Sequence, residues 1–153
     1  MNKQDLTNFL FNARGKTNAK AGGQVVPAIE GTEQAEYSEG DWTYRDIYFN
    51  GRNSFAGTDV VYYQGKPVWA SSYYARYTDI SEEKLDEILR KSIKEHPEVN
   101  AWKKIEKTII DGYEYENIPN SENQSIEMVS GTERITSNGK EIYLLYYAGG
   151  LLD

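Results

Sequence analysis

Aromatic and polar side chains that could contact a ligand are concentrated between Gly40 and Arg76. Tyrosine and tryptophan combine an apolar ring with a polar tip, so groups of them line sites for nucleobases, sugars and other planar molecules. An aspartate among such rings can have a shifted pKa, and an arginine can hold an anion through two parallel hydrogen bonds. We therefore predict a ligand-binding site formed by Trp42, Tyr44, Arg45, Asp46, Tyr48, Trp69, Tyr73 and Arg76.

The carboxylates of the same stretch could also transfer protons. An aspartate on a strand beside an arginine is usually part of a structural ion pair, however, and Arg45 and Asp46 point to opposite faces of a strand. Asp59 and Glu133, which each follow a Gly-Thr pair, are interpreted as acceptors for turn amides. We predict no catalytic residue and a non-enzymatic protein.

The chain lacks the residues that several other kinds of chemistry need. The chain has no cysteine, and its single histidine, His96, directly precedes Pro97 at the end of a predicted helix. Zinc sites held by cysteine or by several histidines are therefore excluded, and a serine–histidine–aspartate triad is disfavoured. No nucleophile elbow, phosphate-binding loop or dinucleotide fingerprint is present. We expect neither a metal nor a cofactor.

Charge and composition narrow the class of protein further. The net charge of −7 repels a phosphate backbone, which disfavours nucleic-acid binding. No window approaches the roughly 20 apolar residues of a membrane span, and the N-terminus has no long apolar run of a signal peptide. At 153 residues the chain is expected to be a single domain, 1–153, of a bacterial or phage cytoplasm.

The predicted site lies on three strands joined by turns at Asn50-Gly51 and Gln64-Gly65. Because side chains alternate between faces, Trp42, Tyr44, Asp46 and Tyr48 share one face of the first strand. Trp69, Ser71 and Tyr73 likewise share one face of the third.

Two helices are expected beside these strands. The spacing of Leu6, Phe9, Leu10 and Ala13 predicts an N-terminal helix with one apolar stripe that ends near Gly15. A second helix, over 81–96, is predicted to begin at Ser81 as N-cap. Residues 16–39 are expected to be mostly loop, either a lid over a pocket or a flexible connection. A helical turn or irregular segment is expected over 99–109.

The last third of the sequence resembles the first meander. Glycines, aromatic residues and their neighbours recur at nearly constant offsets, with one hairpin loop three residues longer in the second copy. We therefore predict an α+β fold of two pseudo-repeated three-stranded antiparallel meanders, over about 40–76 and 111–150, with an N-terminal and a central helix packed on the sheet. The matching segments are 42–47 with 113–118, 57–61 with 131–135, and 65–69 with 139–143.

Three motifs give a family resemblance: Gly40-Asp-Trp-x-Tyr-Arg-Asp-x-Tyr, Phe55-x-Gly-x-Asp-Val-Val-Tyr, and Gly65-x-Pro-Val-Trp followed by Tyr73-Tyr74. Together they resemble a bacterial and phage domain of unknown function that occurs alone or on the C-terminal side of repressor-type helix-turn-helix regulators. The resemblance implies a sensor or interaction domain. This chain has no helix-turn-helix of its own.

Three functions are consistent with these features. The first is a small-ligand-binding domain, a sensor or a protein that sequesters a signal, whose aromatic site holds a small polar or nucleotide-like molecule. The second is a protein-interaction or inhibitor module that binds a basic partner through the same surface. The third is a hydrolase or lyase that uses the carboxylates.

Overall fold

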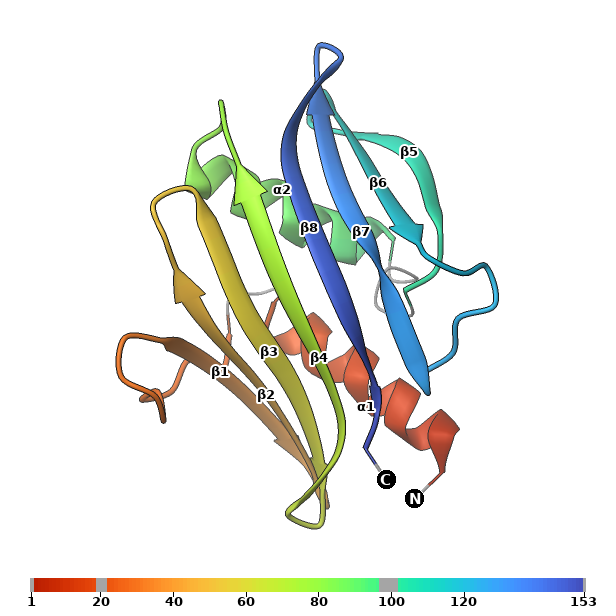
Figure 1. Ribbon diagram of the computed structural model, residues 1–153. Helices are drawn as coiled ribbons and strands as arrows, with labels where there is room; N and C mark the ends of the chain where they lie inside the picture. Colours follow the sequence, from red (N-terminus) through yellow and green to blue (C-terminus); the bar gives the residue numbers. More distant parts are fainter. Residues whose placement is uncertain (1, 19–21, 97–101, 153) are drawn as a thin grey trace.

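The computed structural model describes residues 2–18, 22–96 and 102–152. Two helices and eight strands make an α+β fold (Figure 1). In chain order the elements are α1 (Lys3–Lys16), β1 (Glu33–Glu39), β2 (Trp42–Asn50), β3 (Ser54–Tyr63), β4 (Lys66–Tyr77), α2 (Glu82–Glu95), β5 (Ile105–Ile110), β6 (Tyr113–Pro119), β7 (Met128–Ser137) and β8 (Lys140–Leu151).

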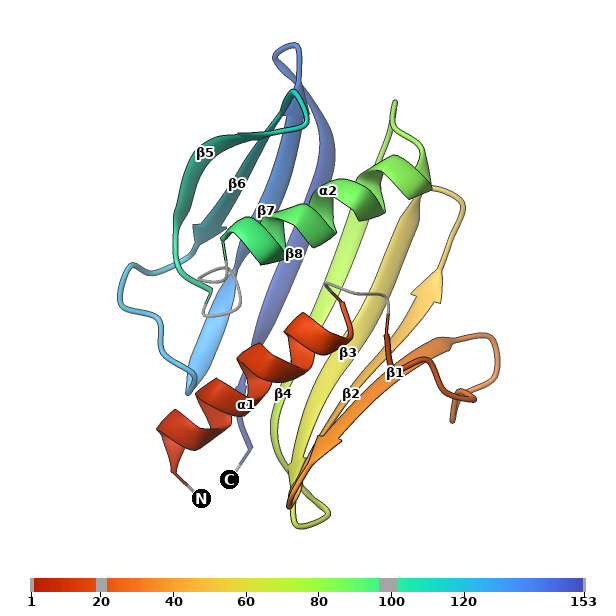
Figure 2. The same ribbon diagram turned by 180° about the vertical axis from the view of Figure 1, so that it is seen from behind.

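All eight strands join one antiparallel sheet in the order β1-β2-β3-β4-β8-β7-β6-β5. Each run of four strands is a meander, and β4 pairs with β8 where the two runs meet. Both helices cross the same face of the sheet, and the opposite face carries no helix (Figures 1 and 2). The side chains that point toward the helices therefore form the interior of the molecule.

The prediction of three strands in each meander was wrong, because each run contains four. The strand β1 lies within the segment 16–39 that was expected to be mostly loop. Its sequence is polar because it is an edge strand of which only Gln34 and Ala35 are buried. The strand β5 has an irregular register between Ile105 and Thr108, which hides its alternation. It occupies residues 105–109 of the segment 99–109, where a helical turn or irregular segment was expected, and residues 99–101 lie outside the described residues.

The two helices follow from their sequence signals. Leu6, Phe9, Leu10 and Ala13 are the buried residues of α1, as predicted, although the helix continues past Gly15 to Lys16. The side-chain oxygen of Ser81 accepts a hydrogen bond from the backbone N–H of Lys84, which confirms the predicted N-cap of α2.

The buried apolar residues form two separate clusters. One lies under α1 and joins Leu10 to Tyr44 and Trp69 of the sheet. The other lies under α2 and joins Ile88 to Tyr143 and its neighbours. Polar groups occupy the interior where these two clusters meet.

Candidate functional site

A cavity of about 470 Å³ is lined by residues of both helices and of the sheet. This volume is within the range of sites for small molecules, roughly 300–1,000 Å³. The end of α1 contributes Arg14 to the wall, and α2 contributes Leu85, Leu89 and Ile93. The sheet contributes aromatic and acidic side chains from several strands, among them Asp46, Tyr48, Phe55, Asp59, Tyr73, Tyr77, Glu133, Tyr143 and Tyr147.

Two tyrosines stand at the centre of this wall. Tyr73 of β4 and Tyr147 of β8 are direct partners in the sheet register. Each extends over a glycine of its other neighbouring strand, Gly57 of β3 or Gly131 of β7. A Cβ atom on Gly57 would lie 2.6 Å from Cζ of Tyr73, and one on Gly131 would lie 2.5 Å from the Tyr147 hydroxyl. Glycine is required at both positions because any side chain would displace the phenol ring.

Asp46 and Asp59 form a buried acidic pair next to Tyr73. They are register partners on β2 and β3, and only 7% and 1% of their surfaces are exposed. Asp59 accepts hydrogen bonds from the Tyr44 hydroxyl at 2.8 Å and the Ser71 hydroxyl at 3.3 Å. It also forms an ion pair with Arg14.

Asp46 has fewer partners. One of its oxygens, Oδ1, accepts a hydrogen bond from the Tyr73 hydroxyl at 2.7 Å, and its carboxyl also interacts with that of Asp59. Burial and the negative charge of Asp59 raise the pKa of Asp46 well above its usual value, against the opposing effects of Tyr73 and Arg14. Asp46 therefore keeps its proton at higher pH than an ordinary aspartate.

Arg14 keeps its charge although it is buried. Burial disfavours the charged guanidinium, but the attraction of Asp59 outweighs this effect and raises the pKa of Arg14. Its Nε atom has no hydrogen-bond partner in the described part of the chain. The ion pair of Arg14 with Asp59 therefore places one positive and one negative group at the cavity wall.

A third carboxylate lies on the other half of the sheet. Glu133 of β7 accepts hydrogen bonds from the hydroxyls of Tyr115 and, at 3.1 Å, Tyr143. Burial raises the pKa of Glu133, although both hydrogen bonds oppose this shift. The nearby Tyr147 hydroxyl is buried, and the side chains of Asn117 and Gln124 are its polar neighbours.

The eight predicted site residues separate into four groups. Asp46, Tyr48 and Tyr73 line the cavity. Tyr44 is fully buried, and its hydroxyl donates to the cavity residues Asp59, at 2.8 Å, and Asn18, at 3.5 Å.

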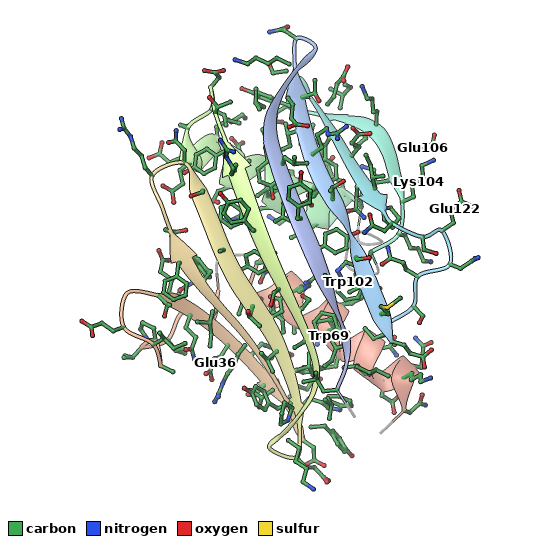
Figure 3. All side chains as sticks on the ribbon, in the orientation of Figure 1. Glu36, Trp69, Trp102, Lys104, Glu106 and Glu122 are labelled. Atoms are coloured by element: carbon green, nitrogen blue, oxygen red, sulfur yellow. The ribbon has the colours of Figure 1, made fainter. Side chains whose placement is uncertain are left out.

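The two predicted tryptophans belong to the apolar cluster under α1. Trp69 is fully buried, and its indole N–H donates to the backbone carbonyl of Ile126 at 3.0 Å. Its ring lies 5.1 Å from that of Trp102 (Figure 3). Trp42 stacks on Phe9 at 5.4 Å between ring centres.

The two predicted arginines lie on the uncovered face of the sheet. Arg45 pairs with Glu36 there at 2.7 Å, and Arg76 is exposed. Neither lines the cavity, so neither can supply the anion contact that was expected of it. The alternation of a strand separates them from Asp46 and Tyr73.

Sequence reasoning missed several residues at the cavity. The interpretation of Asp59 and Glu133 as acceptors for turn amides was wrong, because both lie within strands and accept hydrogen bonds from tyrosines. The recurrence of a tyrosine and an acid at matching positions of the two meanders, Tyr44 with Asp59 and Tyr115 with Glu133, was the signal available. Arg14 lies beside the apolar stripe of α1, and no sequence pattern predicts its ion pair with Asp59 on β3.

Residues 46–152 match the model of a protein family described as a domain of unknown function, DUF5680. The chain belongs to this family. The part that matches DUF5680 contains Asp46, Asp59, Tyr73, Glu133 and Tyr147, and it leaves out α1 and β1. No curated protein and no solved structure matches the chain.

Two further findings concern the described residues. No group of three or more histidine, cysteine, aspartate or glutamate side chains in them is arranged to hold a metal ion. Neither of their helices has the length and apolar character needed to span a membrane.

Proposed function

We propose that this DUF5680 protein is a binding domain that holds a small polar molecule in the cavity lined by both helices and the sheet. The observation that carries the proposal is the group of ionisable side chains around the cavity, the buried Asp46 and Asp59 and the half-buried Arg14 and Glu133. Charges removed from water lower stability unless they are well paired, so their concentration here favours a functional role. The family resemblance implies a sensor or interaction domain.

The charges at the cavity favour a polar molecule without phosphate. The two arginines that were expected to supply an anion contact, Arg45 and Arg76, lie on the opposite face of the sheet. Among the charged side chains at the cavity wall, carboxylates outnumber cations, and they would repel an anion.

We further infer that the two meanders are structural repeats with different sites. Tyr44 donates to Asp59 as Tyr115 donates to Glu133, and Tyr73 extends over Gly57 as Tyr147 extends over Gly131. The position of Asp46 is taken by Asn117 in the second meander. The first meander therefore carries one more ionisable group at the cavity.

Asp46 and Asp59 also favour a second candidate function, that of a hydrolase or lyase. One carboxyl whose pKa is raised, beside one that is paired with an arginine, is the kind of arrangement that a general acid and a general base need. This candidate predicts a substrate whose turnover stops in Asp46→Asn while its binding persists.

Thermal unfolding with a panel of small molecules tests the proposed function. A ligand of the cavity raises the unfolding temperature of the wild type, and it has a smaller effect on Tyr73→Phe, which removes one hydroxyl from the wall. The matched control is Tyr74→Phe, because Tyr74 is the next residue on β4 and is 47% exposed on the other face. A ligand that shifts all three proteins equally would place binding outside the cavity and contradict the proposal.

A further inference from the structure

We infer that the molecule held in the cavity is a small organic cation, an amine on an aromatic or short aliphatic body. This inference rests on the proposed function, because it names the class of ligand for the same cavity. Three features of the wall lead to it: its unbalanced carboxylates, the buried carboxyl of Asp46, and its aromatic rings.

The first feature is the charge balance of the wall. Six carboxylates line the cavity and only two cationic side chains do. Both cations are already paired, Arg14 with Asp59 and Arg90 with Asp86 at 3.1 Å. The carboxylates without an ion pair in the described part of the chain are Glu33, Asp46, Glu82 and Glu133.

The second feature is the buried carboxyl of Asp46. It is more than nine-tenths buried, and among the described residues the Tyr73 hydroxyl donates a hydrogen bond to its Oδ1 atom. A carboxylate can accept more than one hydrogen bond at each oxygen. An ammonium group has three N–H donors and no acceptor, so it can use the remaining acceptor capacity of this carboxyl.

The third feature is the set of rings around these acceptors. Phe55, Tyr73, Tyr77, Tyr143 and Tyr147 contribute to the same wall. The face of an aromatic ring attracts a cation, and this attraction is stronger at a site removed from water. The same rings provide apolar contact for the body of the ligand.

The neighbours of Asp46 favour the same class. Asp59 already carries the contact with Arg14, so a second cation beside Asp46 would pair with the charge that Asp46 acquires when it loses its proton. An anion or a neutral alcohol would leave that charge uncompensated.

Calorimetric titration with molecules that differ only in their polar head tests this inference. Tyramine, tyrosol and 4-hydroxyphenylacetate share one ring and end in an ammonium, a hydroxyl and a carboxylate. Putrescine, 1,4-butanediol and succinate form the corresponding aliphatic series. At neutral pH we expect the amine of at least one series to bind about tenfold or more tighter than its alcohol, and the carboxylate not to bind.

Variants locate the binding. Asp46→Asn should weaken binding of the amine about tenfold and leave the alcohol unaffected. Tyr147→Phe provides a second variant at the wall, and Glu106→Gln, at a side chain that is 85% exposed, is the control that should change nothing (Figure 3).

Two results would overturn the inference, and they differ in what they say of the proposed function. Equal or tighter binding of an alcohol or a carboxylate, sensitive to Tyr147→Phe, would reject the cation and retain the cavity as a binding site. No binding by either amine at about 1 mM would reject the cation as ligand. Native mass spectrometry of the purified protein would then show whether the cavity binds any small molecule, as the proposed function requires.

Discussion

Asp46 and Asp59 face each other across β2 and β3 on the buried side of the sheet, and Arg14 forms its ion pair with only one of them, Asp59. Like charges directly opposite each other on neighbouring strands destabilise a sheet. The corresponding position in the second meander is occupied by the uncharged Asn117, whose side-chain amide donates to the carbonyl of Lys103 at 2.7 Å. A neutral residue is therefore compatible with such a position, and the aspartate is better explained by binding than by folding.

Replacement of Asp46 by asparagine should stabilise the protein at neutral pH. The pKa of Asp46 is raised in the folded state, so the fold binds this proton more tightly than the unfolded chain does. Stability is therefore lost as pH rises from about 4, the pKa of an unfolded aspartate, through the raised pKa. Asp46→Asn removes that loss, so its free energy of unfolding should exceed that of the wild type by about 1–2 kcal/mol at neutral pH.

Urea unfolding of the wild type and Asp46→Asn across this pH range measures the difference directly. Other groups that titrate, including Glu133, contribute to both proteins and cancel in the comparison. A variant less stable than the wild type by the same amount at every pH would contradict the account.

The buried ion pair should show strong coupling. Arg14→Met leaves Asp59 charged and without its cation in the interior, which costs about 3–5 kcal/mol. Asp59→Asn should likewise destabilise, and the double variant should lose clearly less than the sum of the two single variants. A double-mutant cycle by urea unfolding provides the coupling energy. Simple additivity would mean that the two side chains do not interact as described.

Gly57→Ala should displace Tyr73 from its place at the cavity. The added Cβ would lie 2.7 Å from the carbonyl oxygen of Ile47 as well as against the phenol ring, so the loss of stability should be about 2 kcal/mol. The matched control is Gly15→Ala in α1, where a Cβ meets no atom within 4 Å and helix propensity predicts a gain of about 1 kcal/mol. Chemical denaturation compares the three proteins, and equal stability of Gly57→Ala and the wild type would refute the packing described.

Trp69→Ala and Tyr73→Phe should have different consequences. Trp69 is fully buried against Trp102, so its truncation leaves a void and costs about 3–5 kcal/mol. Tyr73→Phe keeps the ring and removes only the donor to Asp46, so stability should change little while ligand affinity falls. Paired measurements of unfolding and binding separate the two. If Trp69→Ala stayed stable but lost affinity, and Tyr73→Phe kept its affinity, the ligand would bind at the tryptophans and not in the cavity.

The fold was predictable where local signals are strong. Ser81 marks the start of α2 because capping depends on neighbouring residues alone, and strand alternation placed Asp46 and Tyr73 together opposite Arg45. The edge strand β1 was missed because its exposed positions are polar and resemble loop.

The site was harder to predict than the fold because its residues meet only through tertiary structure. Arg14 reaches Asp59 from a helix, and Glu133 reaches the cavity from the far half of the sheet. Tryptophan and tyrosine are equally suited to a binding site and to an apolar core, and only the position of α1 places Trp42 and Trp69 in the core. The position of α1 on the sheet cannot be predicted from the sequence alone.

Native mass spectrometry of the purified protein tests the central claim, that the cavity binds a small molecule, most directly. The account predicts an adduct on the wild type that is released on denaturation, is weakened or lost in Tyr73→Phe, and persists in Tyr74→Phe. A bare wild-type mass that stays bare with every compound of the panel would contradict it. So would an adduct that Tyr74→Phe removes and Tyr73→Phe retains.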